Sequence, residues 1–390
     1  MLTSLLLLAC GIDPARVPAH PPYARDGAVI QDDRVAFALV GGTRGLVPGA
    51  NDVADQIVSD VRSEVAARDL DFVALTGGYV RKSGTGEWEA FDERWKDVLL
   101  PVGASDGSQR VPVLALPGDA ERWGDKGLVG YGAAFPGQGP DIGLGRVSSW
   151  GSFDLKSGPR TWRVIWLDPN EVALGSRWKD QLFWLPKVAS TGFDQLLVLM
   201  PDARYTPVPG REDDAEGDVA ELLGVIDEHS PMSSLVGVFT GGASTNSLVL
   251  PTGAYGEAHL LAGGAGDGAD SLARTKGDGE AAIALEPVFD GVLAGQFEGD
   301  KATLPPHVVE AEAAGTYDGG AFPVHGWWIV EISGGRLLAT FRMRVDGVMT
   351  DVYAAKWTKK DGWVGGLPAA PSPSTPAPPP SAPEPAPAIK

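Results

Sequence analysis

The stretch RVAFALVG, residues 34–41, is followed along the chain by LDFVALTG (residues 70–77) and VPVLALP (residues 111–117). Each is a short apolar run that ends in glycine or proline, which is the pattern of a strand buried on both faces of a sheet. Three more runs share this apolar character: RVIWLD at 163–168, QLLVLM at 195–200 and LVGVFT at 235–240. These runs predict the buried strands of the fold.

Longer segments between the runs have helical periodicity. In residues 51–68, Asn51 suits a helix N-cap, and one face of the helix collects apolar side chains at Val53, Ile57, Val58, Val61 and Val65. The other predicted helices are 87–100, 177–188 and 213–229, and two strands joined at Gly334-Gly335 are predicted at 326–345. Because strands and helices alternate, we predict the fold class α/β, a layered α/β sandwich.

Composition restricts the classes of partner. The chain has 390 residues, of which 43% are hydrophobic, so it can bury a sizeable core. Acidic residues outnumber basic ones by 51 to 32, and the net charge is −19. Such a charge repels phosphate backbones, so we expect no nucleic acid partner. The excess of acid serves solubility, and an acidic recognition surface is the alternative.

The first ten residues read MLTSLLLLAC, an apolar run that ends in the single cysteine of the chain. This resembles a bacterial lipoprotein signal peptide, residues 1–10, with the lipobox Leu7-Leu8-Ala9-Cys10 and lipidation of Cys10. The run is too short to cross a bilayer as a helix. The resemblance implies an exported protein whose partner is the membrane, reached through the lipid anchor. Since Gly11 and not Asp follows the cysteine, it implies the outer membrane in a Gram-negative cell. A buried apolar N-terminus with a free thiol is the alternative.

The remaining boundaries follow from composition. Residues 11–33 are rich in proline and alanine and predict a flexible linker, and residues 34–366 form the folded body. Residues 367–390 are a Pro/Ala-rich tail that has too little apolar surface to fold, so we predict it to be disordered.

Glycine-rich loops follow the predicted strands, where α/β sheets place their reactive groups. In chain order the loops read Val40-Gly41-Gly42-Thr43-Arg44-Gly45, Leu75-Thr76-Gly77-Gly78-Tyr79, Leu116-Pro117-Gly118-Asp119-Ala120-Glu121, Leu199-Met200-Pro201-Asp202-Ala203-Arg204 and Phe239-Thr240-Gly241-Gly242-Ala243-Ser244. Their order and spacing resemble the motifs of the calcineurin-like metallophosphoesterases: Asp-x-His, Gly-Asp, Gly-Asn-His-Asp/Glu, a lone His, and Gly-His-x-His. The resemblance extends from about Arg34 to Val345. It implies a phosphoesterase-type domain and a centre of two divalent metals bridged by a carboxylate.

The residues at the ligand positions that this resemblance implies are unsuited to metal. The first motif has Gly42 and Arg44, and the bridging carboxylate is replaced by Gly78. The other positions carry Asp119, Ala120, Pro201, Gly242 and Ser244. Only Asp119, with Ser244 a poor second, offers an oxygen ligand. We therefore expect no metal, no cofactor and no catalytic residue, although the family would imply two divalent metals.

Three functions remain open from the sequence. The first is a non-catalytic pseudo-metallophosphoesterase, a binding or scaffold lipoprotein of the cell envelope. The alternative is a metal-dependent hydrolase with a rewired or single-metal site built from Asp119, Asp202 and either Asp168 or His259. A purely structural envelope protein without a ligand pocket is the third.

Arginines on the strand-end loops suggest a ligand for the first of these functions. Arg44, Arg122 and Arg204 would ring the old metal site and hold an anionic small ligand, helped by free N–H groups of the glycine-rich turns. An envelope protein is the other candidate partner. The competing interpretation is that each arginine pairs with a nearby acid such as Glu121 or Asp202.

Overall fold

The six apolar runs all form strands in the computed structural model. They are β2 (Arg34–Val40), β3 (Phe72–Leu75), β4 (Val113–Ala115), β6 (Arg160–Trp166), β7 (Gln195–Met200) and β8 (Leu235–Thr240). The structure describes residues 27–44, 50–99, 111–125, 127–135, 149–202, 217–231, 234–241, 246–251, 257–263, 317–322, 326–345 and 348–366. The expected signal peptide with Cys10 and the expected tail at 367–390 lie outside these residues.

One sheet has seven strands in the order β15-β14-β13-β12-β2-β3-β4. Strands β2, β3 and β4 run parallel, whereas β12 (Gly326–Ser333), β13 (Arg336–Val345), β14 (Val348–Thr358) and β15 (Gly362–Gly366) form antiparallel pairs. The predicted hairpin is confirmed, because Ser333 pairs with Arg336 across the two-residue turn Gly334-Gly335.

The other sheet has eight strands in the order β1-β5-β6-β7-β8-β10-β9-β11. Its further strands are β1 (Ala28–Gln31), β5 (Gly151–Ser157), β9 (Asn246–Pro251), β10 (Ala258–Ala262) and β11 (Tyr317–Phe322). Strand β1 pairs in parallel with β5 at the sheet edge. It falls inside the segment 11–33 that we expected to be a linker, so the folded body begins before residue 34.

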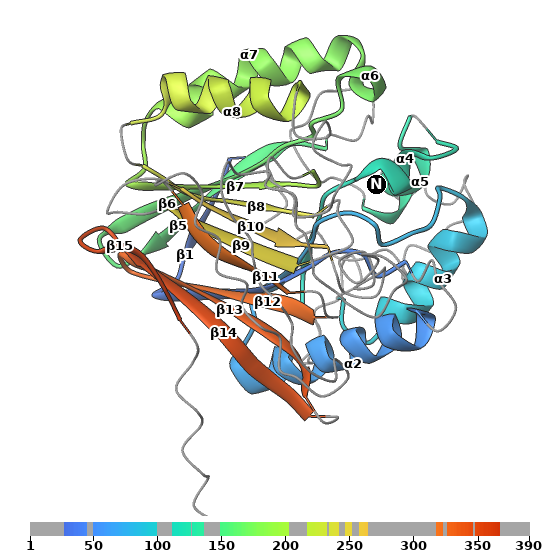
Figure 1. Ribbon diagram of the computed structural model, residues 1–390. Helices are drawn as coiled ribbons and strands as arrows, with labels where there is room; N and C mark the ends of the chain where they lie inside the picture. The colour runs from blue at the N-terminus through green and yellow to red at the C-terminus, as the bar shows by residue number, and fades with distance from the viewer. Residues whose placement is uncertain are drawn as a thin grey trace, which may run out of the picture.

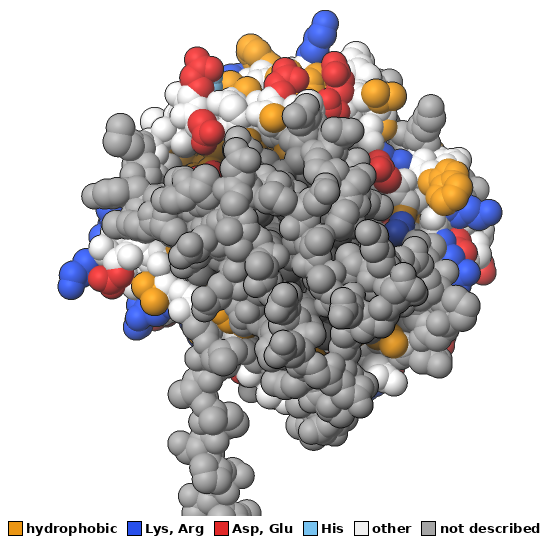
Figure 2. All heavy atoms as spheres, in the orientation of Figure 1, with side chains coloured by type: hydrophobic (Ala, Val, Ile, Leu, Met, Phe, Trp, Pro, Cys, Tyr) orange, Lys and Arg blue, Asp and Glu red, His pale blue; other side chains and the backbone are white. Residues whose placement is uncertain are grey.

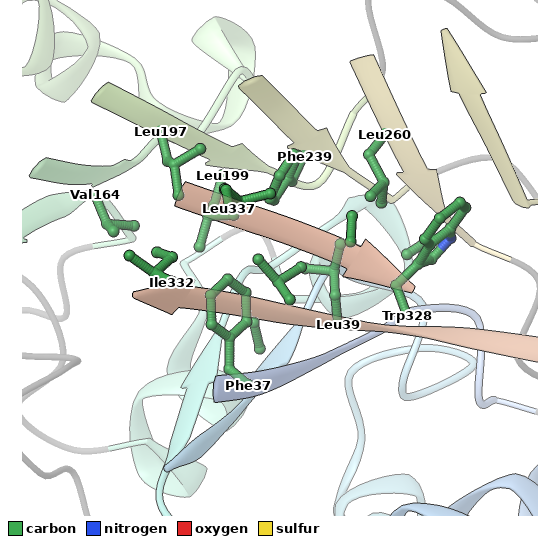
Figure 3. Packing of buried hydrophobic residues seen from close by; sticks show 14 of the residues in the cluster. Phe37, Leu39, Val164, Leu197, Leu199, Phe239, Leu260, Trp328, Ile332 and Leu337 are labelled. Carbon is green, nitrogen blue, oxygen red and sulfur yellow. The ribbon is translucent and has the colours of Figure 1, made fainter. Parts of the chain in front are cut away.

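The two sheets pack face to face around the main core. In β2, Val35, Phe37 and Leu39 point into the core between the sheets, while Ala36, Ala38 and Val40 point to the opposite face. This alternation explains why every residue of the run after Arg34 is buried. Figure 3 shows side chains from both sheets meeting in this space, including Phe37 and Ile332 from one sheet and Leu197 and Leu260 from the other.

Tryptophans bridge the sheets by hydrogen bonds as well as by packing. The indole N–H groups of Trp328, Trp162 and Trp363 donate to the carbonyl oxygens of Leu261 (3.2 Å), Gly334 (2.7 Å) and Val236 (2.8 Å). Each bond joins a strand or turn of one sheet to a residue of the other. A buried indole N–H needs an acceptor, so these bonds also fix how the sheets face each other.

Helices cover the outer face of each sheet, which gives an α/β/β/α sandwich (Figure 1). Helices α2 (Ala50–Arg68), α3 (Thr85–Trp95) and α5 (Val129–Ala134) pack on the seven-stranded sheet. Helices α6 (Glu171–Leu174), α7 (Ser176–Ser190) and α8 (Asp218–His229) pack on the eight-stranded sheet. The short helix α4 (Asp119–Arg122) follows β4 directly. The predicted fold class, a layered α/β sandwich, is confirmed.

The surface carries charges of both signs. Figure 2 shows acidic and basic side chains interspersed over the described part of one face. Among the residues that the structure describes, no helix is long and apolar enough to cross a membrane.

Candidate functional site

The loops that follow the central strands of both sheets converge at one edge of the sandwich. A Cβ atom placed on Gly77, after β3, would lie 3.4 Å from both the Cα of Gly118, after β4, and the Cβ of Pro201, after β7. A Cβ on Gly241, after β8, would lie 1.8 Å from the carbonyl oxygen of Thr76. The 1.8 Å approach at position 241 is possible only for glycine. The strand-end loops chosen from the sequence are therefore brought together as expected.

Gly42 and Gly78, at the first and second of the implied ligand positions, lie on loops that contact each other through their backbones. The N–H of Gly42 donates to the carbonyl of Gly77 at 3.0 Å. Gly78 has φ +68°, and a Cβ on it would lie 3.3 Å from the Cα of Gly42. An aspartate at position 78 would therefore need a left-handed backbone and would press on the neighbouring loop. The backbone of the first loop therefore lies in tight contact with the place where the Cβ of any residue other than glycine at position 78 would be.

The other described ligand positions supply a single carboxylate. Ala120 and Pro201 are buried and have no metal-binding atom, and Arg44 is partly buried. Asp119 is exposed, and its Oδ1 accepts a hydrogen bond from Nδ2 of Asn170 at 3.2 Å. Gly242, Ser244 and Arg204 lie outside the described residues. One exposed carboxylate, opposed by an arginine on the first loop, does not fit a two-metal centre.

The side chains considered for a rewired metal site do not gather. Within the described ranges no group of three His, Cys, Asp or Glu side chains is placed to hold a metal ion. His259 is buried near the start of β10, where its Nε2 lies 3.3 Å from Oε1 of Glu257. Asp202 follows β7 and is partly exposed. Asp168 is fully buried, and its carboxylate accepts hydrogen bonds from Arg122 and Ser149.

Arg122 and Asp168 form a buried ion pair. The exposed fractions of the two side chains are 6% and 0%. Arg122 Nη2 and Ser149 Oγ both donate to Oδ2 of Asp168, and Gln181 of α7 binds the backbone N–H and carbonyl of Asp168 at 3.0 and 2.9 Å. Burial raises the pKa of the Asp168 carboxyl, and the nearby Arg122 charge opposes that rise. Arg122 thus pairs with an internal acid, which is the competing interpretation that the sequence left open for these arginines.

Glu121 is the polar side chain at this edge whose role sequence reasoning missed. Its carboxylate is fully buried and accepts the backbone N–H groups of Gly78, Tyr79, Val80 and Gly118. Burial raises the pKa of the Glu121 carboxyl, and the N–H groups act in the opposite direction. In the loops after β3 and β4, the expectation of free N–H groups is therefore wrong for these four residues. The available signal was the position of Glu121, three residues after Gly118, which is the spacing of a helix capping box.

These contacts involve some of the groups that the sequence suggested for binding an anion. Arg122 is paired with Asp168, and the amides of the second loop are bound by Glu121. Arg44 remains a candidate. A Cβ on Gly78 would lie 3.9 Å from its Cδ, so its side chain approaches the old bridging position.

No protein-family model and no curated protein matches the chain. Among solved structures the chain is similar to the purple acid phosphatase PPD1 from seeds of yellow lupin (Lupinus luteus), with 13% sequence identity and a TM-score of 0.53, over 84% of this chain and 54% of that one. This chain therefore spans about half the length of the lupin protein.

Two further structures are similar at lower scores. One is GAP50, the anchor in the inner membrane complex of Plasmodium, with 10% identity and a TM-score of 0.47 over 82% of this chain and 89% of that one. The other is a dimetal phosphatase from Danio rerio, with 14% identity and a TM-score of 0.46 over 82% of this chain and 99% of that one. At these identities a likeness shows the fold alone, and the likeness to the lupin phosphatase shows that this chain has a metallophosphoesterase-type fold.

Proposed function

We propose that this protein is a non-catalytic pseudo-metallophosphoesterase that acts as a binding or scaffold lipoprotein of the bacterial cell envelope. The observation that carries the proposal is the packing of Gly78 against Gly42, with a would-be Cβ 3.3 Å from the Cα of Gly42. Without a carboxylate at that place, two metals have no bridging ligand. The carboxylate of Asp168, which follows β6, is held by Arg122 and Ser149.

A hydrolysis assay tests the non-catalytic part of this proposal. We expect no turnover of a chromogenic phosphodiester above the uncatalysed background with Mn²⁺, Fe²⁺ or Zn²⁺ added. The matched control is Asp119→Ala, which removes the one carboxylate at a described ligand position; we expect it to behave as wild type. Turnover in the wild type that Asp119→Ala abolishes would establish the alternative, a hydrolase with a rewired site.

The envelope location rests on the leader Leu7-Leu8-Ala9-Cys10. Lipidation with two or three acyl chains would anchor the protein durably, whereas a single chain would bind only reversibly. We expect mass spectrometry of the mature protein to find an N-terminal, acylated Cys10, in the outer membrane if the cell is Gram-negative. A retained Met1, or an unmodified Cys10 in the soluble fraction, would refute the anchor. The partner at the envelope is then either a small anionic ligand or another envelope protein.

A further inference from the structure

The Glu121 carboxylate is enclosed by backbone donors from two loops. Oε1 accepts from Tyr79 N at 2.8 Å and from Val80 N at 3.1 Å. Oε2 accepts from Gly118 N at 2.9 Å and from Gly78 N at 3.1 Å. Each oxygen therefore receives two N–H groups. The side chain is fully buried, so these bonds replace the water that an exposed carboxylate would bind.

Only an ionised carboxylate matches this set of donors. A carboxylate accepts at both oxygens and donates at neither, whereas a carboxylic acid or an amide carries hydrogen on one side. In the present geometry, the hydrogen of an acid or an amide would point at two N–H groups, which also carry hydrogen and cannot accept it. Hydrogen bonds from N–H to a charged acceptor are also about twice as strong as neutral ones. The arrangement is therefore selective for charge as well as for shape.

The local sequence explains how the donors converge. Gly77 and Gly78 have φ values of +92° and +68°, so the chain turns sharply as it leaves β3. Successive N–H groups then point to one place, which is a backbone concavity of the kind that binds anions. Glu121 lies in the first turn of α4, from where its side chain reaches back to Gly118 N and onward to the loop after β3.

We propose that Gly78, Tyr79 and Val80, together with Gly118, form a carboxylate-binding site whose resident ligand is the Glu121 side chain. This internal ligand holds the loops after β3 and β4 together at the edge where the metallophosphoesterase fold implies metal ions. When the Glu121 carboxylate is removed, the site takes a free small carboxylate. The proposal goes beyond the proposed function and holds whether or not the protein hydrolyses phosphoesters.

Two substitutions at one position separate this role from packing. Glu121→Gln keeps the volume but sets an NH₂ group against N–H donors, so we expect a melting temperature almost as low as that of Glu121→Ala. Glu121→Ala removes a CH₂–COO⁻ unit, which acetate reproduces. Acetate, at constant ionic strength set with chloride, should therefore raise the melting temperature of Glu121→Ala and leave Glu121→Gln unchanged, because the glutamine fills the site.

The control is Glu87→Ala, since Glu87 accepts the N–H of Arg81 from the same loop at an exposed position. We expect no acetate effect in this variant. A Glu121→Gln variant as stable as wild type would overturn the proposal, and so would equal responses of both Glu121 variants to acetate.

The wild-type protein provides a test that needs no variant to fold. Hydrogen bonds to a charged acceptor move amide protons far downfield in NMR spectra. We expect downfield amide protons for Tyr79 and Val80, which make one bond each to Oε1. Amide shifts of these residues in the range of unstructured peptides would overturn the proposal even if both variants fail to fold.

Discussion

We expect the Arg122→Ala variant to lose about 3–5 kcal/mol of its free energy of unfolding at neutral pH. The reason is that the Asp168 carboxyl, which is 0% exposed, would lose its ion-pair partner in a place that water does not reach. The Ser149 hydroxyl and the Gln181 side chain, which binds the backbone of Asp168, are both neutral and cannot replace the charge of Arg122. Urea unfolding at neutral pH measures the loss. A loss below about 1 kcal/mol, which is the usual contribution of an exposed ion pair, would show that Arg122 and Asp168 do not form a buried ion pair.

The same variant should show a defined pH dependence. Burial already raises the pKa of Asp168 above its ordinary value of 3.8, and removing Arg122 removes the larger of two arginine charges that oppose this rise, the other being Arg177. Between 3.8 and the higher folded-state pKa, the folded variant binds more protons than the unfolded chain, so its stability falls as the pH rises through that window. The difference from wild type should therefore be small in acid and largest at neutral pH.

Two controls isolate the buried pair. Arg122→Met combined with Asp168→Asn removes both charges, so it should recover most of the stability that Arg122→Ala loses. Arg62→Ala breaks an ion pair with Asp97 whose side chains are 57% and 55% exposed. We expect that variant to stay within about 1 kcal/mol of wild type.

The second large effect is expected for Trp328→Ala, which should lower the free energy of unfolding by about 3–5 kcal/mol. Trp328 is fully buried between the sheets (Figure 3). Its ring centroid lies 5.0 Å from that of Phe341, and its indole N–H donates to the carbonyl oxygen of Leu261 in the other sheet. Truncation leaves a cavity and removes the bond between sheets. Chemical denaturation of purified variants provides the measurement.

Two further tryptophan variants calibrate this result. Trp328→Phe keeps a ring but loses the N–H donor, so its cost should fall between wild type and Trp328→Ala. Trp123→Ala changes an indole that is 69% exposed, and we expect a change within about 0.5 kcal/mol. If Trp328→Ala were no more costly than Trp123→Ala, Trp328 would not hold the sheets together as described.

Much of the fold is predictable because strands buried on both faces need continuous apolar residues. The runs 34–41, 70–77 and 195–200 satisfy that need and form β2, β3 and β7. Edge strands do not need such a continuous apolar run. Strand β1 has alternating exposure and β15 reads GWVGG, so neither gave a signal in the sequence.

The candidate site was predictable in place but not in chemistry. Glycine-rich turns after buried strands located the edge, because the carboxyl ends of the central strands meet there. The contacts that fill it join residues far apart in the chain: Glu121 binds amides 41 to 43 residues away, and Arg122 pairs with Asp168, 46 residues away. The Glu121 contacts depend on the pairing of β3 with β4 within one sheet, and the Arg122–Asp168 pair depends on how the two sheets pack. Local sequence encodes neither arrangement.

Elemental analysis of the purified chain, combined with thermal unfolding in the presence and absence of a chelator, tests the metal-free site most directly. Gly42, Gly78, Ala120 and Pro201 offer no side-chain ligand, and Glu121 and Asp168 are bound within the protein. We therefore predict Mn, Fe and Zn contents far below one atom per chain and the same melting temperature with and without chelator, since no metal binding is linked to folding. Stoichiometric metal, with a melting temperature that falls on chelation and in Asp119→Ala, would contradict it.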